Sequence, residues 1–279
     1  MKVDRTLLPV LPLTLFFALF VFAPLLLLGY VSLHNDMAIQ QAGVAQYIKF
    51  LGDGFNLGIL GQTLWLAACT TVLALLVGYP LAYLYTLAPR NVQRVLILLI
   101  VLPMLTSAVV RTFAWVVILG RQGIINEVLL GLAWIEAPLK LLYTPSAVVV
   151  ALAQIEMPLM VLPLITALSN IPPNLREASL SLGAGRWHTF FKVIVPLSMP
   201  GLLAGCLLVF AAAASAFVTQ TLVGGGRLML MPFYIYQQAI QSNNYPFAAT
   251  IAMILLVSVL AIVMLMNLIG RRFAGIAHA

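Results

Sequence analysis

The chain has 279 residues, of which 63% are hydrophobic and only 8% are charged. A soluble domain carries about 25% charged residues, so the composition excludes an ordinary soluble protein. The formal net charge is +7. The basic residues lie mainly in loops between the apolar segments, which favours a role in orienting the chain in the membrane over nucleic-acid binding.

Six apolar segments are long enough to cross a bilayer, which takes roughly 20 apolar residues in a helix. They are continuously apolar rather than alternating, which favours helices over a barrel. The predicted spans are 9–33, 59–87, 95–119, 146–170, 201–223 and 247–270, joined by connections 34–58, 88–94, 120–145, 171–200 and 224–246. The first span is too long for a signal-peptide core and no cleavage site follows it, so we expect it to be retained. The sequence therefore predicts an all-α membrane protein with one domain, 1–279.

The loops on one side of the predicted membrane hold most of the basic residues. That side has nine, namely Lys2, Arg5, Arg90, Arg94, Arg176, Arg186, Lys192, Arg271 and Arg272, and the other has four, namely Lys49, Arg121, Lys140 and Arg227. The more basic side of a membrane protein faces the cytoplasm, so we expect both termini to be cytoplasmic.

The connection 171–200 is the longest polar interruption on that side. Pro172 and Pro173 are expected to end the fourth span, because proline lacks a backbone donor. Asn174 is expected to cap a new short helix with Glu177 three residues later, and Gly183 or Gly185 is expected to end it in a left-handed turn.

A second short helix is predicted directly after this turn. Trp187, Phe190, Phe191 and Ile194 have the spacing of one helical face. Pro196 is expected to stop this helix, and Pro200-Gly201 to open the fifth span. From composition alone the resulting helix–turn–helix is either an interfacial hairpin lying on the membrane or a docking element for a soluble partner.

This loop resembles the EAA motif of ABC importer permeases. The motif positions are Glu177-Ala178-Ser179, Gly183 after three more residues, and Val-Ile-Val-Pro ending at Pro196 after a further nine. The chain departs from the motif at Ser179, which replaces an alanine, and at Val193 and Val195. Four further segments resemble the spermidine/putrescine branch, namely LPMLTSAVVRTFAW (102–115), GRQGIINEVL (120–129), YTPSAV (143–148) and FVTQTLVGGG (217–226).

The resemblance implies a type I ABC importer permease fold in the bacterial inner (plasma) membrane, working by alternating access. It implies four partners: a second permease, two cytoplasmic ATPase subunits and a periplasmic substrate-binding protein. The loop 171–200 would be the coupling loop to the ATPase, with Glu177, Ala178, Gly183, Arg186 and Pro196 as its residues. The implied substrate is a polyamine such as spermidine or putrescine. The same machine could carry another small polar solute, such as an amino acid derivative, opine, phosphonate or anion.

Catalytic and metal-site patterns are missing from the sequence. There is no phosphate-binding G-x-x-x-x-G-K-[ST] motif, so this chain is expected to hydrolyse no ATP and to bind no cofactor, ATP being used by the partner subunits. The three histidines, His34, His188 and His278, lack metal-ligand spacing. Cys69 and Cys206 lie in apolar runs and are expected to be packed as free thiols.

Two charged residues lie inside predicted spans. Glu156 is ten residues into the fourth span, roughly 15 Å deep, and Arg111 is sixteen residues into the third, roughly 24 Å from the cytoplasmic edge. Glu156 could contact a cationic substrate, pair with Arg111, or be protonated and fill an interface. Glu156 and Arg111 are both candidates for the translocation path, and Arg111 could be structural or gating. Met157 and Pro158 are expected to loosen the helix and free a carbonyl.

Two other classes of protein are less consistent with these features. An ion-coupled secondary transporter or channel would need no ATPase partner, and the EAA-like loop and the scarcity of intramembrane charge argue against it. A membrane-embedded enzyme would need a cluster of nucleophile, base or metal ligands, which the sequence lacks.

Overall fold

The protein is helical over the part of the chain that the structure describes. The computed structural model describes residues 11–36, 40–226 and 228–276. These ranges contain no β-strand, and an isolated bridge joins His34 to Ala42. Several predicted basic residues, Lys2, Arg5 and Arg227, and the histidine His278 lie outside the described residues, as do the side chains of Arg271 and Arg272.

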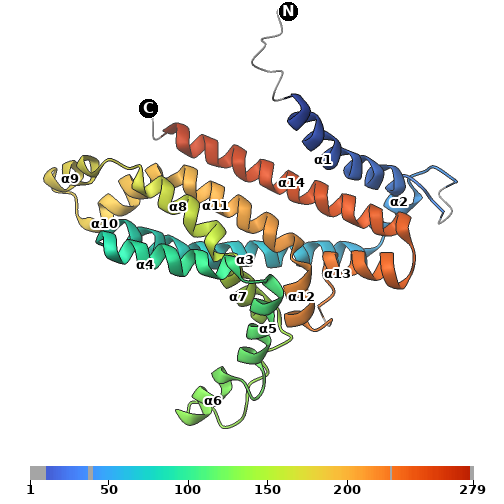
Figure 1. Ribbon diagram of the computed structural model, residues 1–279, viewed down its shortest axis with the longest axis horizontal. Helices are drawn as coiled ribbons and strands as arrows, with labels where there is room; N and C mark the ends of the chain where they lie inside the picture. The colour runs from blue at the N-terminus through green and yellow to red at the C-terminus, as the bar shows by residue number, and fades with distance from the viewer. Residues whose placement is uncertain (1–10, 37–39, 227, 277–279) are drawn as a thin grey trace, which may run out of the picture. The chain divides into compact units, whose positions relative to one another are not determined.

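The elements follow one another along the chain as short and long helices (Figure 1). They are α1 (Leu11–Ser32), α2 (Ala45–Leu51), α3 (Gly54–Leu87), α4 (Arg90–Val101), the 3-10 turn η1 (Leu102–Leu105), α5 (Ala108–Leu119), α6 (Ile124–Gly131), α7 (Pro145–Ile155), α8 (Met157–Ser169), α9 (Pro173–Ser181), α10 (Arg186–Thr189), the π-helical turn η2 (Phe190–Ile194), α11 (Val195–Ser215), α12 (Phe217–Gly224), α13 (Met231–Tyr236), the π-helical turn η3 (Gln237–Gln241) and α14 (Tyr245–Ile276).

The number of membrane spans agrees with the sequence prediction. Within the described residues five segments are long and apolar enough to cross a membrane: Pro12–Ser32, Gly54–Leu87, Ala108–Gly131, Arg186–Ser215 and Tyr245–Gly270. The bent pair α7 and α8 makes a sixth when counted as one span. The prediction of an all-α protein with six spans is therefore confirmed, although three of the spans differ from the predicted straight helices.

The third predicted span, 95–119, is wrong as a single helix. The helix that begins at Arg90 ends at Val101, and the chain becomes extended at Thr106 before α5 starts at Ala108. Pro103 contributes to this break because it has no backbone donor. The Ser107 side chain then accepts a hydrogen bond from the Val109 N–H at 3.2 Å and caps the new helix. The apolar segment that can span a membrane is shifted to Ala108–Gly131.

The fifth predicted span, 201–223, begins earlier and ends earlier than expected. Helical structure runs from Arg186 to Ser215 without a stop at Pro196, which lies in the first turn of α11. The preceding π-helical turn changes the local hydrogen-bond pattern, so proline is accommodated there rather than ending the helix. The chain then breaks at Ala216, whose ψ of 82° is not helical, and α12 follows.

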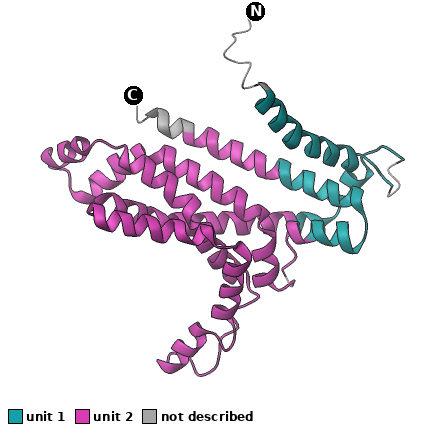
Figure 2. Ribbon diagram, in the orientation of Figure 1, with its two compact units in different colours: residues 1–59, 234–257 teal, residues 60–233, 258–279 magenta. Residues whose placement is uncertain are grey.

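The chain divides into two compact units (Figure 2). The first comprises Met1–Ile59 and Tyr234–Val257. Its core is aromatic: the Phe50 and Phe247 rings lie 6.5 Å apart, and the Tyr234 hydroxyl donates to the Asn56 side-chain oxygen at 2.9 Å. These contacts hold the chain around α2 to the start of α14.

The most apolar stretch of α1 is entirely exposed in the isolated chain. This exposure is expected of a helix that faces lipid or another subunit.

The second unit, Leu60–Phe233 and Ser258–Ala279, contains most of the spans. Its most extensive helix pair is α8 with α11, which lie side by side in Figure 1. Gly201 and Gly205 on α11 permit this close approach, since a side-chain carbon at Gly205 would lie 3.0 Å from the Met160 carbonyl oxygen. Small residues in this span therefore serve packing within the chain.

Candidate functional site

The first candidate site is the polar loop between α8 and α11. Its first helix, α9, starts at Pro173, with Pro172 in the extended conformation before it. Proline suits the first helical position because its fixed φ is already helical and its missing donor is not needed there. The prediction that Asn174 caps this helix with Glu177 is wrong, because Asn174 lies inside α9 and no side chain caps it.

The end of α9 follows the prediction. Gly183 has φ of +83°, and the Ala184 N–H donates to the Ser179 carbonyl at 3.2 Å while the Gly183 N–H donates to that of Leu180 at 3.0 Å. This pair of bonds is the Schellman arrangement, in which a left-handed residue closes a helix. Gly185, the alternative, has an ordinary φ of −66°.

The loop residues singled out from the sequence are mostly on the surface. Glu177, Ala178, Gly183 and Arg186 are exposed, and Pro196 is partly buried at the start of α11. A polar, accessible surface of this kind can bind another protein. The alternative of a membrane-lying hairpin would use the same exposed aromatic rings of Trp187 and Phe191.

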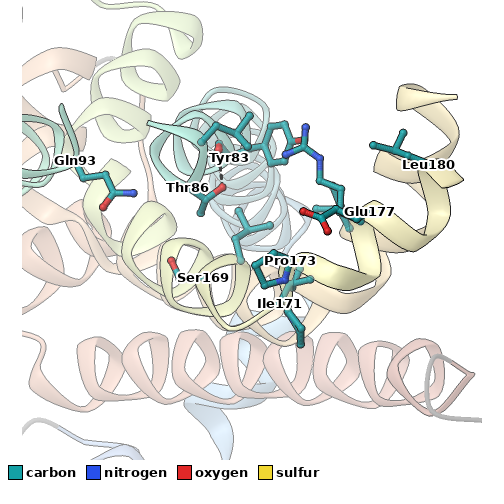
Figure 3. A pocket seen from close by; sticks show the side chains of 13 residues that line it. Tyr83, Thr86, Gln93, Ser169, Ile171, Pro173, Glu177 and Leu180 are labelled. Carbon is teal, nitrogen blue, oxygen red and sulfur yellow. Dashed lines mark hydrogen bonds between the residues drawn. The ribbon is translucent and has the colours of Figure 1, made fainter. Parts of the chain in front are cut away.

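A cavity of about 650 Å³ separates α9 from the helix ends beside it (Figure 3). Tyr83, Thr86 and Leu87 at the end of α3, Gln93 of α4, and Leu168 and Ser169 of α8 line it, together with Ile171, Pro172, Pro173, Arg176, Glu177, Leu180 and Ile194. No residue of α9 is buried. The helix therefore lies at the surface, with the cavity between it and the ends of α3 and α8.

The second candidate site is the bend between α7 and α8. The two helices meet at Glu156 with an angle of 46°. Pro158 in the first turn of α8 lacks a backbone donor, which removes one helical hydrogen bond near the bend. The predicted loosening of the helix beside Met157 and Pro158 is confirmed.

Arg111 of α5 binds the carbonyl that this bend leaves accessible. Its Nη1 donates to the Ile155 carbonyl oxygen at 2.9 Å, while its Nε is buried without a partner among the described atoms. One turn further along α5, the Trp115 indole N–H donates to the Gln154 side-chain oxygen at 3.0 Å. The two helices are thus joined by polar bonds at the neighbouring residues Gln154 and Ile155.

The depth estimate for Arg111 and Glu156 does not hold in the structure, where Arg111 contacts the residue directly before Glu156. That estimate placed them roughly 9 Å apart in depth by counting along a straight third span. The break at 102–107 makes the counting invalid, because Arg111 is only the fourth residue of α5. The described contacts join Arg111 to the backbone directly before Glu156. Glu156 itself is partly buried at the bend.

A second broken helix adds polar groups that were not singled out from the sequence. The Thr112 and Thr219 hydroxyls share a hydrogen bond at 2.8 Å, which joins α5 to α12. Gln220 is almost fully buried and donates to the Ala213 carbonyl at 2.7 Å across the break at Ala216. The sequence feature that could have identified these residues is the polar run Thr-Gln-Thr at 219–221, which interrupts an apolar segment.

Metal and disulfide chemistry has no support in the described part of the chain. No group of three potential metal-ligating side chains occurs there. Cys69 and Cys206 are free thiols, as expected.

The fold and these sites define a polytopic membrane transport subunit, with a broken span that carries a carboxyl and a helical loop projecting beside a cavity. The sequence matches one family over residues 1–275, and the chain belongs to it: the binding-protein-dependent transport system inner membrane components. It is thus a multi-pass inner-membrane permease subunit of an ABC importer, a transporter component rather than an enzyme.

Comparison with relatives supports this assignment over most of the chain. The chain is 34% identical over 234 residues to the spermidine/putrescine transport system permease protein PotB of Escherichia coli K12, covering 83% of this chain and 85% of that protein. It is 34% identical to PotB of Haemophilus influenzae, covering 70% and 68%. A crystal structure of a bacterial ABC transporter involved in alginate import has the same fold, with a TM-score of 0.74 at 20% identity, covering 97% and 96%.

Proposed function

We propose that this permease imports a polyamine such as spermidine or putrescine by alternating access. It works with a second, related permease, two cytoplasmic ATPase subunits that bind and hydrolyse the ATP, and a periplasmic binding protein that delivers the substrate. The identity with PotB over most of the chain supports the substrate class. The excess of basic residues in alternate loops supports cytoplasmic termini and a cytoplasmic loop 171–200.

The observation that carries the substrate proposal is the Glu156 carboxyl at the bend of the fourth span. Arg111 donates to the Ile155 carbonyl at the helix break, and the partly buried Glu156 is the next residue along the chain. Acidic groups within a membrane domain face its interior or a water-filled path, and broken helices form transporter binding sites near the midplane. Glu156 is therefore assigned to the translocation path as a contact for an amine, and Arg111 as the residue that fixes the bend.

Replacing Glu156 with glutamine tests this assignment. The change preserves shape but removes the charge, and a charge-assisted hydrogen bond contributes about 1.5–3 kcal/mol. We expect ATP-driven spermidine uptake by the reconstituted importer to fall about 10- to 100-fold. Glu136→Gln is the matched control, because Glu136 is exposed in the connection after α6 and lies outside the spans. Unchanged uptake by Glu156→Gln would exclude direct contact with the amine.

A panel of solutes tests the cargo independently of any substitution. Binding-protein-dependent stimulation of ATP hydrolysis is measured with spermidine, putrescine, a basic amino acid and molybdate. Stimulation by the two polyamines is expected. Stimulation by molybdate alone would show that the cargo is an oxyanion rather than a polyamine. The assignment of the chain to an ABC importer would remain.

We assign the loop 171–200 to ATPase coupling, with Glu177, Ala178, Gly183, Arg186 and Pro196 at the motif positions or beside them. The loop fits this role because its first helix, α9, has no buried residue and lies beside a cavity. A partner can therefore reach both the acid and the turn of α9.

Gly183→Val is expected to uncouple uptake from ATP hydrolysis. The left-handed φ of +83° costs a side-chain-bearing residue roughly 1–2 kcal/mol, although the space around Gly183 is open. The turn should therefore change shape while the spans stay folded, and spermidine uptake should fall about tenfold with ATPase activity retained. Gly185→Ala, at an ordinary φ in open space, is the control and should transport normally. Equal uptake by the two variants would argue against coupling through this turn.

A further inference from the structure

The coupling loop makes a specific bond between its two helices. The Ser179 and Thr189 hydroxyls share a hydrogen bond at 2.9 Å, which joins α9 to α10. Thr189 is only 2% exposed, whereas Ser179 is partly buried, so the bond lies at the edge of the packed region. Ser179 occupies the position where the EAA motif has alanine, which could not make this hydrogen bond.

The residue after Thr189 extends the connection to the membrane bundle. The Phe190 ring makes edge-on contacts with Tyr79 and Tyr83 of α3, with ring centroids 5.7 and 5.2 Å away. The buried Tyr79 hydroxyl in turn shares a hydrogen bond with the Ser198 hydroxyl of α11 at 2.8 Å. A continuous set of contacts therefore runs from α9 to two spans.

Direct support for α9 from the bundle is small. A cavity of about 650 Å³ lies between it and the ends of α3 and α8, and none of its residues is buried (Figure 3). A force applied to α9 can therefore pass through the covalent chain at Pro172, through the turn 182–185 into the continuous helical segment of α10 and α11, or through the contacts of Ser179, Thr189 and Phe190. A chain of packed side chains of this kind transmits displacement when its members move together.

We propose that Ser179, Thr189 and Phe190 are positioning residues that make the coupling loop a rigid lever on α3 and α11. The Ser179–Thr189 bond keeps α9 and α10 in one orientation. Phe190, at the π-helical turn, transfers their displacement to the two tyrosines of α3. This inference rests on the assignment of the loop to ATPase coupling. A loop whose helices swing separately during the cycle is the alternative.

A disulfide between α9 and α10 distinguishes a rigid lever from a swinging loop. Ser179→Cys and Thr189→Cys are combined in a Cys69→Ala, Cys206→Ala background, and the full importer is reconstituted and oxidised with copper phenanthroline. The hydroxyls are 2.9 Å apart, so the two sulfurs can come within bonding distance after a small adjustment. A rigid lever predicts that the oxidised importer keeps at least about half of the spermidine uptake of the reduced one. Loss of more than half on oxidation, restored by dithiothreitol, would overturn the proposal.

Phe190→Ala tests the transfer to α3 separately. We expect uptake to fall at least about tenfold while ATP hydrolysis stays within about twofold, because motion of the loop no longer moves α3. Phe191→Ala is the matched control, since that neighbouring ring is exposed and contacts Trp187 and Phe190 rather than α3. Equal uptake by the two variants contradicts the proposal, and the disulfide experiment stands even if Phe190→Ala fails to fold.

Failure of the cargo proposal gives a different result. In that case the unaltered importer hydrolyses ATP but takes up no spermidine. The oxidised and reduced forms are then compared by uptake of the solute that stimulates ATP hydrolysis in the panel described above. Uptake by the oxidised form of at least about half that of the reduced form supports the lever, and a larger loss that dithiothreitol restores overturns it.

Discussion

Replacing Arg111 with alanine is expected to abolish ATP-driven uptake and to destabilise the permease. The Nη1 group of Arg111 is the donor to the Ile155 carbonyl at the bend of the fourth span. Without it, a carbonyl inside the membrane domain loses its partner, which costs about 1–3 kcal/mol. The bend should relax, and the Glu156 carboxyl beside it should move. Uptake is therefore expected to fall about 100-fold, more than the stability loss alone explains.

Two further variants separate the role of Arg111 from a general effect of charge. Arg111→Lys keeps a charged donor that can reach the carbonyl, and it should recover uptake to within about tenfold of the unaltered protein. Arg121→Ala removes an exposed arginine just after α5 and should leave uptake and melting temperature unchanged. Stability is measured by thermal melting in detergent, and transport by spermidine uptake in proteoliposomes. Normal uptake by Arg111→Ala would show that the bend does not depend on this contact.

The number of spans and the place of the loop could be predicted because both depend on long local patterns. Apolar segments of the length of a bilayer are visible without knowledge of packing. The turn at Gly183 was predictable for a similar reason, since glycine tolerates a left-handed φ and the adjoining residues end a helical pattern. The loosened helix beside Glu156 followed from Pro158 in the same way.

The internal breaks were predicted poorly because they depend on contacts between distant parts of the chain. Pro196 was expected to stop a helix, yet the π-helical turn before it lets the helix continue to Ser215. The break at Ala216 has no proline or glycine to mark it, and Gln220 bridges it through the Ala213 carbonyl. Likewise, nothing in the spacing of Ser179 and Thr189 shows that their hydroxyls meet across a turn.

A bulky substitution between the closely packed helices α8 and α11 is expected to destabilise the permease strongly. Gly201 faces α8, and a side-chain carbon there would lie 2.5 Å from the Pro163 carbonyl oxygen and would also overlap the Ala167 methyl group. A backbone carbonyl inside a helix cannot move away easily, so the helices must separate. Gly201→Leu is therefore expected to destabilise the permease by more than about 3 kcal/mol, beyond the usual range for overpacking.

The expected result is loss of the folded permease from the membrane fraction, measured by fluorescence-detected size exclusion of a tagged chain. Gly201→Ala should give a smaller loss of about 1–3 kcal/mol, seen as a lower melting temperature. Gly61→Ala is the control, because no atom lies within 4 Å of a side-chain carbon at this position of α3. Alanine also has a higher helix propensity than glycine, by about 1 kcal/mol. A Gly201→Leu protein as stable as the Gly61→Ala protein would show that α8 and α11 are not held at this distance in the membrane.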